Sequence, residues 1–249
     1  MNSPIPKKRL DQFLVEKKLV SSRERARQLI MAGSVYINGT KMDKAGALVA
    51  DSEVVIKGKG IPYVSRGGMK MEQALKEFNL SPNGKIVLDA GASTGGFTDC
   101  LLQNGAIKVY AVDVGYGQLA WTLFNDPRVI RIERTNIRYL ARHQVAEMVD
   151  WVVADLSFIS VTLVLEHLLS FLNPGGELIL LIKPQFEVGK GEVGRGGIVK
   201  DEKLHLKAVS KVRDFGTGLG LFCGGVVESP ILGQKGNREF LIHFRKDVK

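Results

Sequence analysis

The stretch Ile86-Val-Leu-Asp-Ala-Gly-Ala-Ser-Thr-Gly-Gly-Phe97 decides the fold of this 249-residue chain. A short apolar run ends at Asp89, and three glycines free the backbone before a second apolar run that includes Leu101 and Leu102. This pattern predicts a strand, a nucleotide-binding turn and the start of a helix. A dinucleotide fingerprint reads Gly-x-Gly-x-x-Gly, but Ser93 breaks that spacing here. The departure favours a smaller adenosyl ligand over a pyrophosphate.

The second predicted strand, Lys108-Val-Tyr-Ala-Val-Asp113, also ends in a carboxylate. An acid at the end of the second strand can accept hydrogen bonds from two ribose hydroxyls. The two features together predict S-adenosylmethionine as the cofactor; the alternative is a structural turn that binds no ligand. The predicted cofactor-binding residues are Asp89, Gly91, Ser93, Thr94, Gly95, Gly96, Phe97, Asp113, Asn136 and Asp155.

Strands and helices alternate through the rest of this region. Further strands are predicted at 129–132, 148–155 and 177–183, and two closing strands at 219–227 and 238–244. The alternation predicts a parallel sheet with helices on both faces, which binds ligands at the carboxyl ends of its strands. Asp89, Asp113, Asp155 and Lys183 all fall at such ends. The five glycines of residues 185–201 predict a mobile flap beside the site.

The composition is that of a globular protein, with 45% hydrophobic and 24% charged residues. Two cysteines cannot build a disulfide framework, which predicts a cytoplasmic protein, and the longest apolar runs are too short for a membrane span. Residues 1–60 contain twelve Lys or Arg and six Asp or Glu, so +6 of the net charge of +9 lies there. A local excess of positive charge predicts a small module that binds nucleic acid.

This basic module is predicted to contain two helices and a small sheet. The first helix starts in the stretch from Lys7 to Leu14, and Ser21 with Glu24 forms a capping-box pattern for the second. Strands are predicted at 35–41, with an Asn-Gly turn, and at 52–57. The predicted RNA-binding residues are Lys7, Lys8, Arg9, Arg23, Arg27 and Arg66, although basic residues are also typical of a solvated helix face.

Residues 7–60 resemble the S4-type RNA-binding domain of a small-subunit ribosomal protein and several RNA-modifying enzymes. The resemblance rests on Arg9-Leu-Asp11, Ser21-Ser-Arg23, Ala26-Arg27, Asn38-Gly39 and nearby apolar positions. We therefore expect a domain at 1–60, a linker at about 57–63 and a second domain at 64–249. The expected fold class is α/β: a Rossmann-like methyltransferase sheet, mostly parallel with an antiparallel last strand, and a small α+β RNA-binding domain at the N-terminus.

Three methyl-transfer chemistries can be compared from the residues that follow the fourth strand. Methylation of an exocyclic amine uses an Asp/Asn-Pro-Pro-aromatic pocket, whereas this chain has Asp155-Leu-Ser-Phe158. Methylation of a pyrimidine carbon needs a nucleophilic cysteine, but Cys100 and Cys223 are predicted within a helix and a strand. Methylation of a ribose hydroxyl needs a group that lowers the cost of losing the hydroxyl proton, and Lys183, at a strand end, can supply it.

Lys70 and Glu239 carry little signal when each is considered alone. Lys70 falls in the first turn of a predicted helix, where a cation opposes the helix dipole, so it either points into solvent or is held for a purpose. Glu239, near the start of the last strand, is typical of a solvated edge residue.

Together, Lys70, Asp155, Lys183 and Glu239 resemble the Lys-Asp-Lys-Glu tetrad of the FtsJ-type ribose 2′-O-methyltransferases. The domain order resembles the TlyA (haemolysin A) family of ribosomal RNA methyltransferases. Matching motifs are Ser65-Arg-Gly-Gly-Met-Lys70, Asp89-Ala-Gly-Ala-Ser-Thr-Gly-Gly-Phe97, Asp155-Leu-Ser-Phe-Ile-Ser160, Ile182-Lys-Pro-Gln-Phe-Glu187 and Gly236-Asn-Arg-Glu239.

The resemblance implies S-adenosylmethionine-dependent 2′-O-methylation of a ribose, expected to be a cytidine, in ribosomal RNA or ribosomal subunits. Lys183 would accept the hydroxyl proton or stabilise its charge, and Asp155 and Glu239 would orient the two lysines. No metal ligand is predicted. Two other classes remain as alternatives: a non-catalytic RNA-binding or ribosome-assembly factor, and a cytolysin, which the family name suggests but which no predicted membrane segment supports.

Overall fold

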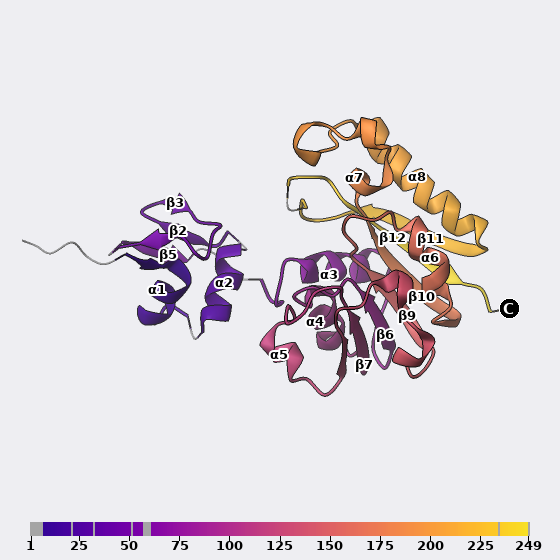
Figure 1. Cartoon of the computed structure of the whole chain (residues 1–249), viewed down its shortest axis with the longest axis horizontal. Helices are drawn as coiled ribbons and strands as arrows, with labels where there is room; N and C mark the ends of the chain where they lie inside the picture. The colour runs from indigo at the N-terminus through magenta and orange to yellow at the C-terminus, as the bar shows by residue number, and fades with distance from the viewer. Residues whose placement is uncertain are drawn as a thin grey trace, which may run out of the picture. The chain divides into compact units, whose positions relative to one another are not determined.

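The computed structural model describes residues 7–20, 22–31, 33–50, 52–56, 61–233 and 235–248 of the chain. Two compact units make up the chain, Met1–Arg66 and Gly67–Lys249 (Figure 1). The domain expected at 1–60 falls within the first unit, and part of the expected linker, residues 57–60, lies outside the described residues.

Two helices and two small sheets form the first unit. Its elements are β1 (Lys8–Arg9), α1 (Leu10–Glu16), α2 (Arg23–Met31), β2 (Val35–Ile37), β3 (Thr40–Lys41), β4 (Leu48–Val49) and β5 (Val54–Ile56). β1 pairs with β4, while β2 lies between β3 and β5. Buried apolar residues of both helices, such as Leu14 and Ile30, pack against Val35 of β2 and Val49 of β4 and form the core.

Local signals explain where these elements start and turn. Asn38 and Gly39, between β2 and β3, have φ angles of 46° and 78°, as the predicted Asn-Gly hairpin requires. The Ser22 hydroxyl accepts a hydrogen bond from the Arg25 N–H at 3.1 Å and so caps α2; the predicted cap, Ser21, lies outside the described residues. The first helix begins only at Leu10, because the two basic residues before it pair with β4 as a strand.

A seven-stranded sheet organises the second unit. Its strands are β6 (Ile86–Ala90), β7 (Lys108–Val112), β8 (Val129–Ile132), β9 (Val149–Ala154), β10 (Leu172–Ile182), β11 (Leu221–Glu228) and β12 (Phe240–Lys246). Their order across the sheet is β11-β12-β10-β9-β6-β7-β8. β12 runs antiparallel to both its neighbours, and β6 to β10 pair in parallel. This confirms the predicted Rossmann-like sheet with its antiparallel last strand.

Helices cover both faces of this sheet. They are α3 (Gly67–Glu77), α4 (Gly96–Gln103), α5 (Trp121–Phe124), α6 (Thr162–Leu169), α7 (Pro184–Glu187) and α8 (Glu202–Gly218). Buried side chains of α6 and α8 share one core cluster with Val152 of β9 and Leu180 of β10. α3 packs against α4 and β12, and α8 runs beside β11 (Figure 1). In the described ranges, no helix combines the length and apolar character that a membrane crossing requires.

Strand direction explains why residues far apart in the sequence meet at one edge of the sheet. Asp155 follows β9 and Lys183 follows β10, so both lie just past the carboxyl ends of two parallel neighbours. Glu239 instead precedes β12. Because β12 runs antiparallel to β10, its first residue, Phe240, pairs with Ile182, the last residue of β10. Glu239 therefore reaches the same edge from the opposite direction.

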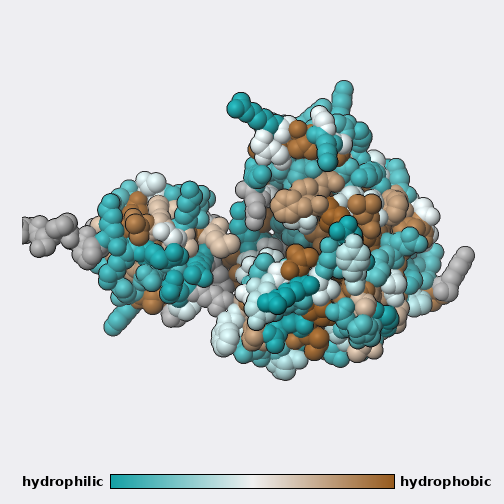
Figure 2. Space-filling model, in the orientation of Figure 1, coloured by the Kyte–Doolittle hydropathy of each residue, from teal (hydrophilic) through white to brown (hydrophobic). Residues whose placement is uncertain are grey.

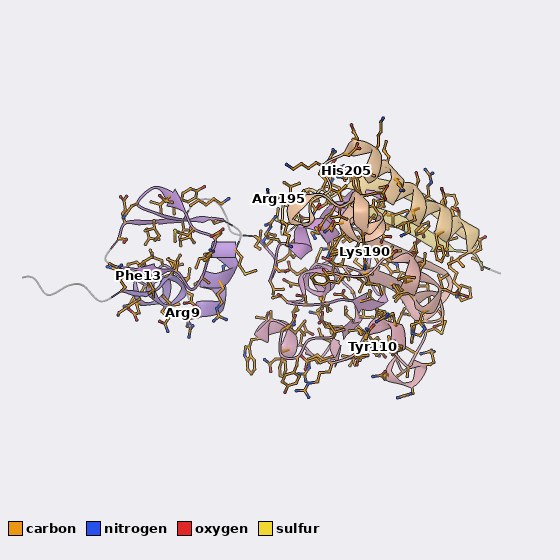
Figure 3. All side chains as sticks on the ribbon, turned by 45° about the horizontal axis from the view of Figure 1, so that its top comes forward. Arg9, Phe13, Tyr110, Lys190, Arg195 and His205 are labelled. Carbon is orange, nitrogen blue, oxygen red and sulfur yellow. The ribbon has the colours of Figure 1, made fainter. Side chains whose placement is uncertain are left out.

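The predicted flap, residues 185–201, contains most of α7 and two 3-10 turns, η3 (Lys190–Glu192) and η4 (Arg195–Gly197). Lys190 and Arg195 mark this segment in Figure 3. Asn237 fixes its far end, because its side chain accepts the Val199 N–H at 2.9 Å and donates to the Gly197 carbonyl at 2.9 Å. The segment is thus tied to the loop that carries Glu239, and its mobility stays a prediction.

Candidate active site

Four charged side chains from four elements meet at the edge of the sheet. The Lys70 ammonium lies 2.7 Å from Glu239 Oε2 and 3.4 Å from Asp155 Oδ2. The Lys183 ammonium lies 2.6 Å from Asp155 Oδ1 and donates a hydrogen bond to the Ser157 hydroxyl at 2.8 Å. Asp155 therefore stands between the two lysines, and Glu239 holds Lys70 from its other side.

Lys70 and Glu239 are buried, at 8% and 3% exposure. Considered singly, each was compatible with a solvated position, and for both residues that interpretation is wrong. Lys70 lies on the same side of α3 as Met71 and Ala74, which pack in the interior, so its charge points toward the sheet edge. A buried charge needs a partner, and each of the two supplies the other's.

The environment of Asp155 keeps its carboxylate ionised. Burial opposes ionisation, but the charges of Lys70 and Lys183 outweigh it and lower the pKa of Asp155 below its usual value. At neutral pH the site thus contains a carboxylate that two ammonium groups share. Such a group holds the lysines in place without competing for their protons.

The glycine-rich turn after β6 brings the backbone close to this tetrad. Gly91 and Gly95 have φ angles of 84° and 93°, and Ser93 has 50°, all in the left-handed region. A Cβ atom on Gly91 would lie 2.6 Å from the Asp155 carbonyl oxygen, and one on Gly95 would lie 2.3 Å from Leu123. The turn can therefore adopt this path only because these positions are glycine.

Asp89, at the end of β6, is fully buried. Its Oδ2 accepts hydrogen bonds from the Thr98 N–H at 3.1 Å and the Thr98 hydroxyl at 2.6 Å. Among the described residues, its Oδ1 has no hydrogen-bond partner. Burial raises the pKa of Asp89 to about 7, against the lowering effect of Thr98. The turn thus contains a carboxyl group that titrates near neutral pH.

A pocket opens beside the turn at the ends of β6, β7 and β8. It is lined by Ala92, Ser93, Ala111, Asp113, Gly115, Gln118, Leu119, Arg131 and Glu133. Asp113 accepts the Ser93 N–H at 2.8 Å on one oxygen and the Gly115 N–H at 2.7 Å on the other. Each carboxylate oxygen has a further lone pair, so Asp113 can also accept hydroxyl donors from a ligand.

The other residues predicted for the cofactor occupy different surroundings. Gly96 and Phe97 are buried at the start of α4, where Phe97 belongs to the core. The Thr94 carbonyl accepts the Ala120 N–H at 3.1 Å. Asn136 caps the turn η1 (Ile137–Tyr139), because its side-chain oxygen accepts the Arg138 N–H at 3.1 Å. These four residues shape the turn and its neighbours, while Ser93 and Asp113 line the pocket itself.

Several residues at the site did not emerge from the sequence. Glu133 and Gln118 line the pocket, Thr98 fixes Asp89, and Ser157 accepts from Lys183. Glu133 directly follows β8, just as Asp113 directly follows β7. An acidic residue at the end of the third strand is therefore the sequence signal that could have predicted Glu133 as a pocket residue. Phe158 has a φ angle of 66° and is 90% exposed, and its ring lies 5.3 Å from that of Phe186.

Three of the predicted RNA-binding residues converge on one carboxylate in the first unit. Asp11, which is fully buried, lies 3.0 Å from Arg9, 3.1 Å from Arg23 and 3.2 Å from Arg27. Arg23 and Arg27 therefore share one face of α2, as their spacing predicts. Arg9 and the core residue Phe13 are marked in Figure 3.

The remaining predicted RNA contacts are spread over the first unit. Lys7 is exposed, Lys8 pairs with Glu16 at 2.6 Å, and Arg66 is half-buried at the end of the unit. Hydrophilic residues cover much of the face of this unit that Figure 2 shows. Across the part of the chain that the structure describes, no cluster of three or more His, Cys, Asp or Glu side chains could hold a metal ion.

Comparisons with known proteins agree with this arrangement. A model of the FtsJ-like methyltransferases matches residues 63–246, and a model of the S4 domain matches residues 8–55. The chain is 46% identical over 239 residues to the 16S/23S rRNA (cytidine-2′-O)-methyltransferase TlyA of Mycobacterium tuberculosis, covering 95% of this chain and 89% of that protein. It is 42% identical over 245 residues to Hemolysin A of Brachyspira hyodysenteriae, covering 95% and 99%.

A solved structure of a Streptococcus thermophilus protein that carries the name hemolysin superposes with a TM-score of 0.77. The two share 44% identity, and the alignment covers 98% of this chain and 90% of that one. Since the family model spans most of the chain and the relatives align over nearly all of it, the chain belongs to the FtsJ-like methyltransferases and carries an S4 domain ahead of the methyltransferase fold.

Proposed function

We propose that this protein uses S-adenosylmethionine to methylate the 2′-hydroxyl of a cytidine ribose in ribosomal RNA. The observation that carries the proposal is the shared contact of Asp155 with Lys70 and Lys183 at the edge of the sheet. The positive charge of these lysines can stabilise the negative charge that loss of a hydroxyl proton leaves on oxygen, and Glu239 holds Lys70 in place. The S4 domain supports RNA as the substrate, and the name of the TlyA relative supports cytidine in ribosomal RNA.

The residues beside the glycine-rich turn fit S-adenosylmethionine. Asp113 would accept the ribose hydroxyls of the cofactor, and Ser93 with Glu133 would line the adenosyl pocket. The buried Asp89, whose Oδ1 has no hydrogen-bond partner within the described part of the chain, would favour a ligand with positive charge near the turn. When bound, S-adenosylmethionine supplies an electrophilic methyl group.

The tetrad would prepare the acceptor ribose. As an ammonium, Lys183 would donate a hydrogen bond to the 2′ oxygen and stabilise the negative charge that develops there. To take the hydroxyl proton instead, Lys183 would have to react as the neutral amine. Asp155 would fix the direction of the Lys183 ammonium, to which it lies 2.6 Å away. Lys70, held by Glu239, would keep Asp155 in place from the other side.

The enzyme would act in the cytoplasm, with ribosomal subunits as its partners. Neither of its two cysteines, Cys100 and Cys223, forms a disulfide bond, as is usual in reducing compartments. The test is to incubate purified protein with each ribosomal subunit and labelled S-adenosylmethionine. Label in the RNA supports the enzyme, absence of label from both subunits contradicts it, and leakage from liposomes would support a cytolysin instead.

A further inference from the structure

Glu187 is a buried carboxylate that lies outside the tetrad. It ends α7, four residues after Lys183, and is 6% exposed. A carboxylate that leaves water must find donors within the protein, or its burial becomes costly. The donors for Glu187 come from two other parts of the same unit.

Both oxygens of Glu187 are occupied. Oε1 accepts the Val161 N–H at 2.8 Å, and Oε2 accepts the Ser160 hydroxyl at 2.5 Å. The Lys211 ammonium, on α8, lies 3.1 Å from Oε2 and also donates to the Glu187 carbonyl oxygen at 2.8 Å. The carboxylate therefore joins the segment after β9, the segment after β10 and the helix α8.

The contact with Val161 also caps a helix. Val161 precedes α6 and makes no capping hydrogen bond with its own side chain. The free N–H groups at a helix start carry partial positive charge, which a carboxylate stabilises. Glu187 thus provides, from 26 residues further along the chain, the negative charge for the start of α6. This contact fixes where the segment after β9 ends.

Two segments carry the central pair of the tetrad. The β9 loop, residues 155–161, begins with Asp155, and the segment called here the β10 loop, residues 183–187, consists of Lys183 and the short helix α7. The first contact between the two loops is within the tetrad itself, where Lys183 meets Asp155 at 2.6 Å and Ser157 at 2.8 Å. The relative positions of Asp155 and Lys183 therefore depend on how the two loops pack against each other.

Two more contacts continue in the same order along both loops. The rings of Phe158 and Phe186 lie 5.3 Å apart. Glu187 then binds Ser160 and Val161 at the far end. In the last contact the Glu187 carboxylate, at 6% exposure, receives hydrogen bonds from Ser160, Val161 and Lys211, so this contact strongly resists separation of the loops.

We infer that Glu187 is a positioning residue for methyl transfer: it locks the β9 loop against the β10 loop so that Asp155 holds Lys183 in its working direction. The inference rests on the proposed function and extends it to a residue outside the tetrad. Glu187 acts through the two loops and its carboxylate is fully used by protein donors. A displacement of about 1 Å in a reacting group can slow a reaction about 100-fold, so this lock matters for the rate.

The test compares Glu187→Ala, Glu187→Gln and the control Glu192→Gln. Glu192 lies in the predicted flap, where its carboxylate pairs at 2.6 Å with Lys207 and accepts the Gly189 N–H at 2.8 Å, and neither partner belongs to the two loops. In single-turnover assays with ribosomal subunits, Glu187→Ala should lower the rate about 10- to 100-fold, while the Kd for S-adenosylmethionine changes less than about twofold. Glu187→Gln keeps an acceptor for Val161 and should recover much of the rate, and the control should match the parent protein.

A second measurement needs no RNA. The rate at which an amine-specific reagent modifies Lys183 is followed by mass spectrometry in each variant. Glu187→Ala should speed modification of Lys183 because the loops separate, whereas Glu192→Gln should not. If Glu187→Ala keeps the parental turnover, loses cofactor binding in step with its rate, or leaves Lys183 modification unchanged, the inference is wrong. If the parent protein methylates no ribosomal RNA, the proposed function fails, and the Lys183 modification rates alone decide the role of Glu187.

Discussion

The ammonium group of Lys70 lies 2.7 Å from the carboxylate of Glu239, and both side chains are buried. Lys70 lies in the first helix of the methyltransferase unit, and Glu239 immediately precedes its last strand. Their contact joins residues from near the two ends of this unit's sequence. It also makes the tetrad part of the unit's stability, because removal of Lys70 deprives the buried Glu239 of its ion pair.

Replacement of Lys70 alone should therefore destabilise the protein. Lys70→Met leaves Glu239 buried and unpaired, and the free energy of unfolding should fall by about 3 kcal/mol. The double variant Lys70→Met with Glu239→Leu should regain most of that loss without regaining activity. Urea unfolding of both single variants and the double variant measures the coupling. If the loss of unfolding free energy in the double variant equals the sum of the losses in the two single variants, the pairing of Lys70 with Glu239 is contradicted.

Lys183 should separate chemistry from cofactor binding. Lys183→Ala removes the group beside Asp155 and should slow methyl transfer by about 10²- to 10⁴-fold. Calorimetric binding of S-adenosylmethionine should not change, because Lys183 is not among the residues that line the pocket. The control Lys203→Ala removes an exposed lysine of α8 and should have parental turnover. Near-parental turnover of Lys183→Ala would remove Lys183 from the mechanism.

Asp89 predicts a particular dependence of stability on pH. Its pKa is raised to about 7 in the folded protein, so between about pH 4 and pH 7 the folded state holds a proton that the unfolded state has lost. The free energy of unfolding should therefore fall as pH rises through this window, by at most about 4 kcal/mol. Asp89→Asn cannot titrate, and it should lack this contribution.

Denaturant unfolding of parent and Asp89→Asn at pH 5 and pH 8 makes the comparison. Other carboxyl groups contribute equally to both proteins, so the difference between the two pH dependences isolates Asp89. Identical pH dependences would show that the Asp89 carboxyl does not titrate in this window.

The edge of the sheet could be predicted from the sequence, because strands end where an apolar run meets Asp89, Asp113 or Asp155. The burial of Lys70 could not be predicted from its local sequence. The helix-dipole argument is local and favours solvent, while the partner that overrides it, Glu239, comes from the far end of the unit. At the level of sequence, only the resemblance to a known tetrad assigned Lys70 and Glu239 to the same site.

The sequence shows which residues are charged, but it does not show which ion pairs they form or how deeply they are buried. Arg9, Arg23 and Arg27 were predicted as RNA contacts, but the sequence did not show that all three meet the buried Asp11. Likewise Glu187 belonged to a recognisable motif, yet its role as a cap for α6 depends on a loop contact that periodicity does not report. Pairings between distant segments arise from tertiary packing, which local patterns do not encode.

Asp11 should control the order of the first unit. Its contact with Arg9 is the largest effect on its carboxyl, and together with Arg23 and Arg27 it holds the pKa of Asp11 well below its usual range against the opposing effect of burial. A lowered pKa stabilises the fold above about pH 4, and this contribution is lost as pH falls further. At neutral pH, Asp11→Asn should therefore destabilise this unit, by about 2 kcal/mol.

Hydrogen exchange locates this effect within the chain. Amides of α1 and α2 should exchange faster in Asp11→Asn, while those of the methyltransferase sheet keep their parental rates. The control Glu16→Gln breaks only the exposed pair with Lys8 and should leave exchange unchanged. Unchanged exchange in Asp11→Asn would mean that the three arginines do not depend on this carboxylate.

The most direct test of the central claim maps the methyl group on the RNA. Each ribosomal subunit is incubated with the protein and labelled S-adenosylmethionine, and the RNA is then hydrolysed in alkali, which needs a free 2′-hydroxyl at every cleaved linkage. The account predicts label in an alkali-resistant dinucleotide whose 5′ residue is cytidine, and no such product with Lys183→Ala. Label on a base, or label that alkali releases as single nucleotides, would contradict methylation of the ribose.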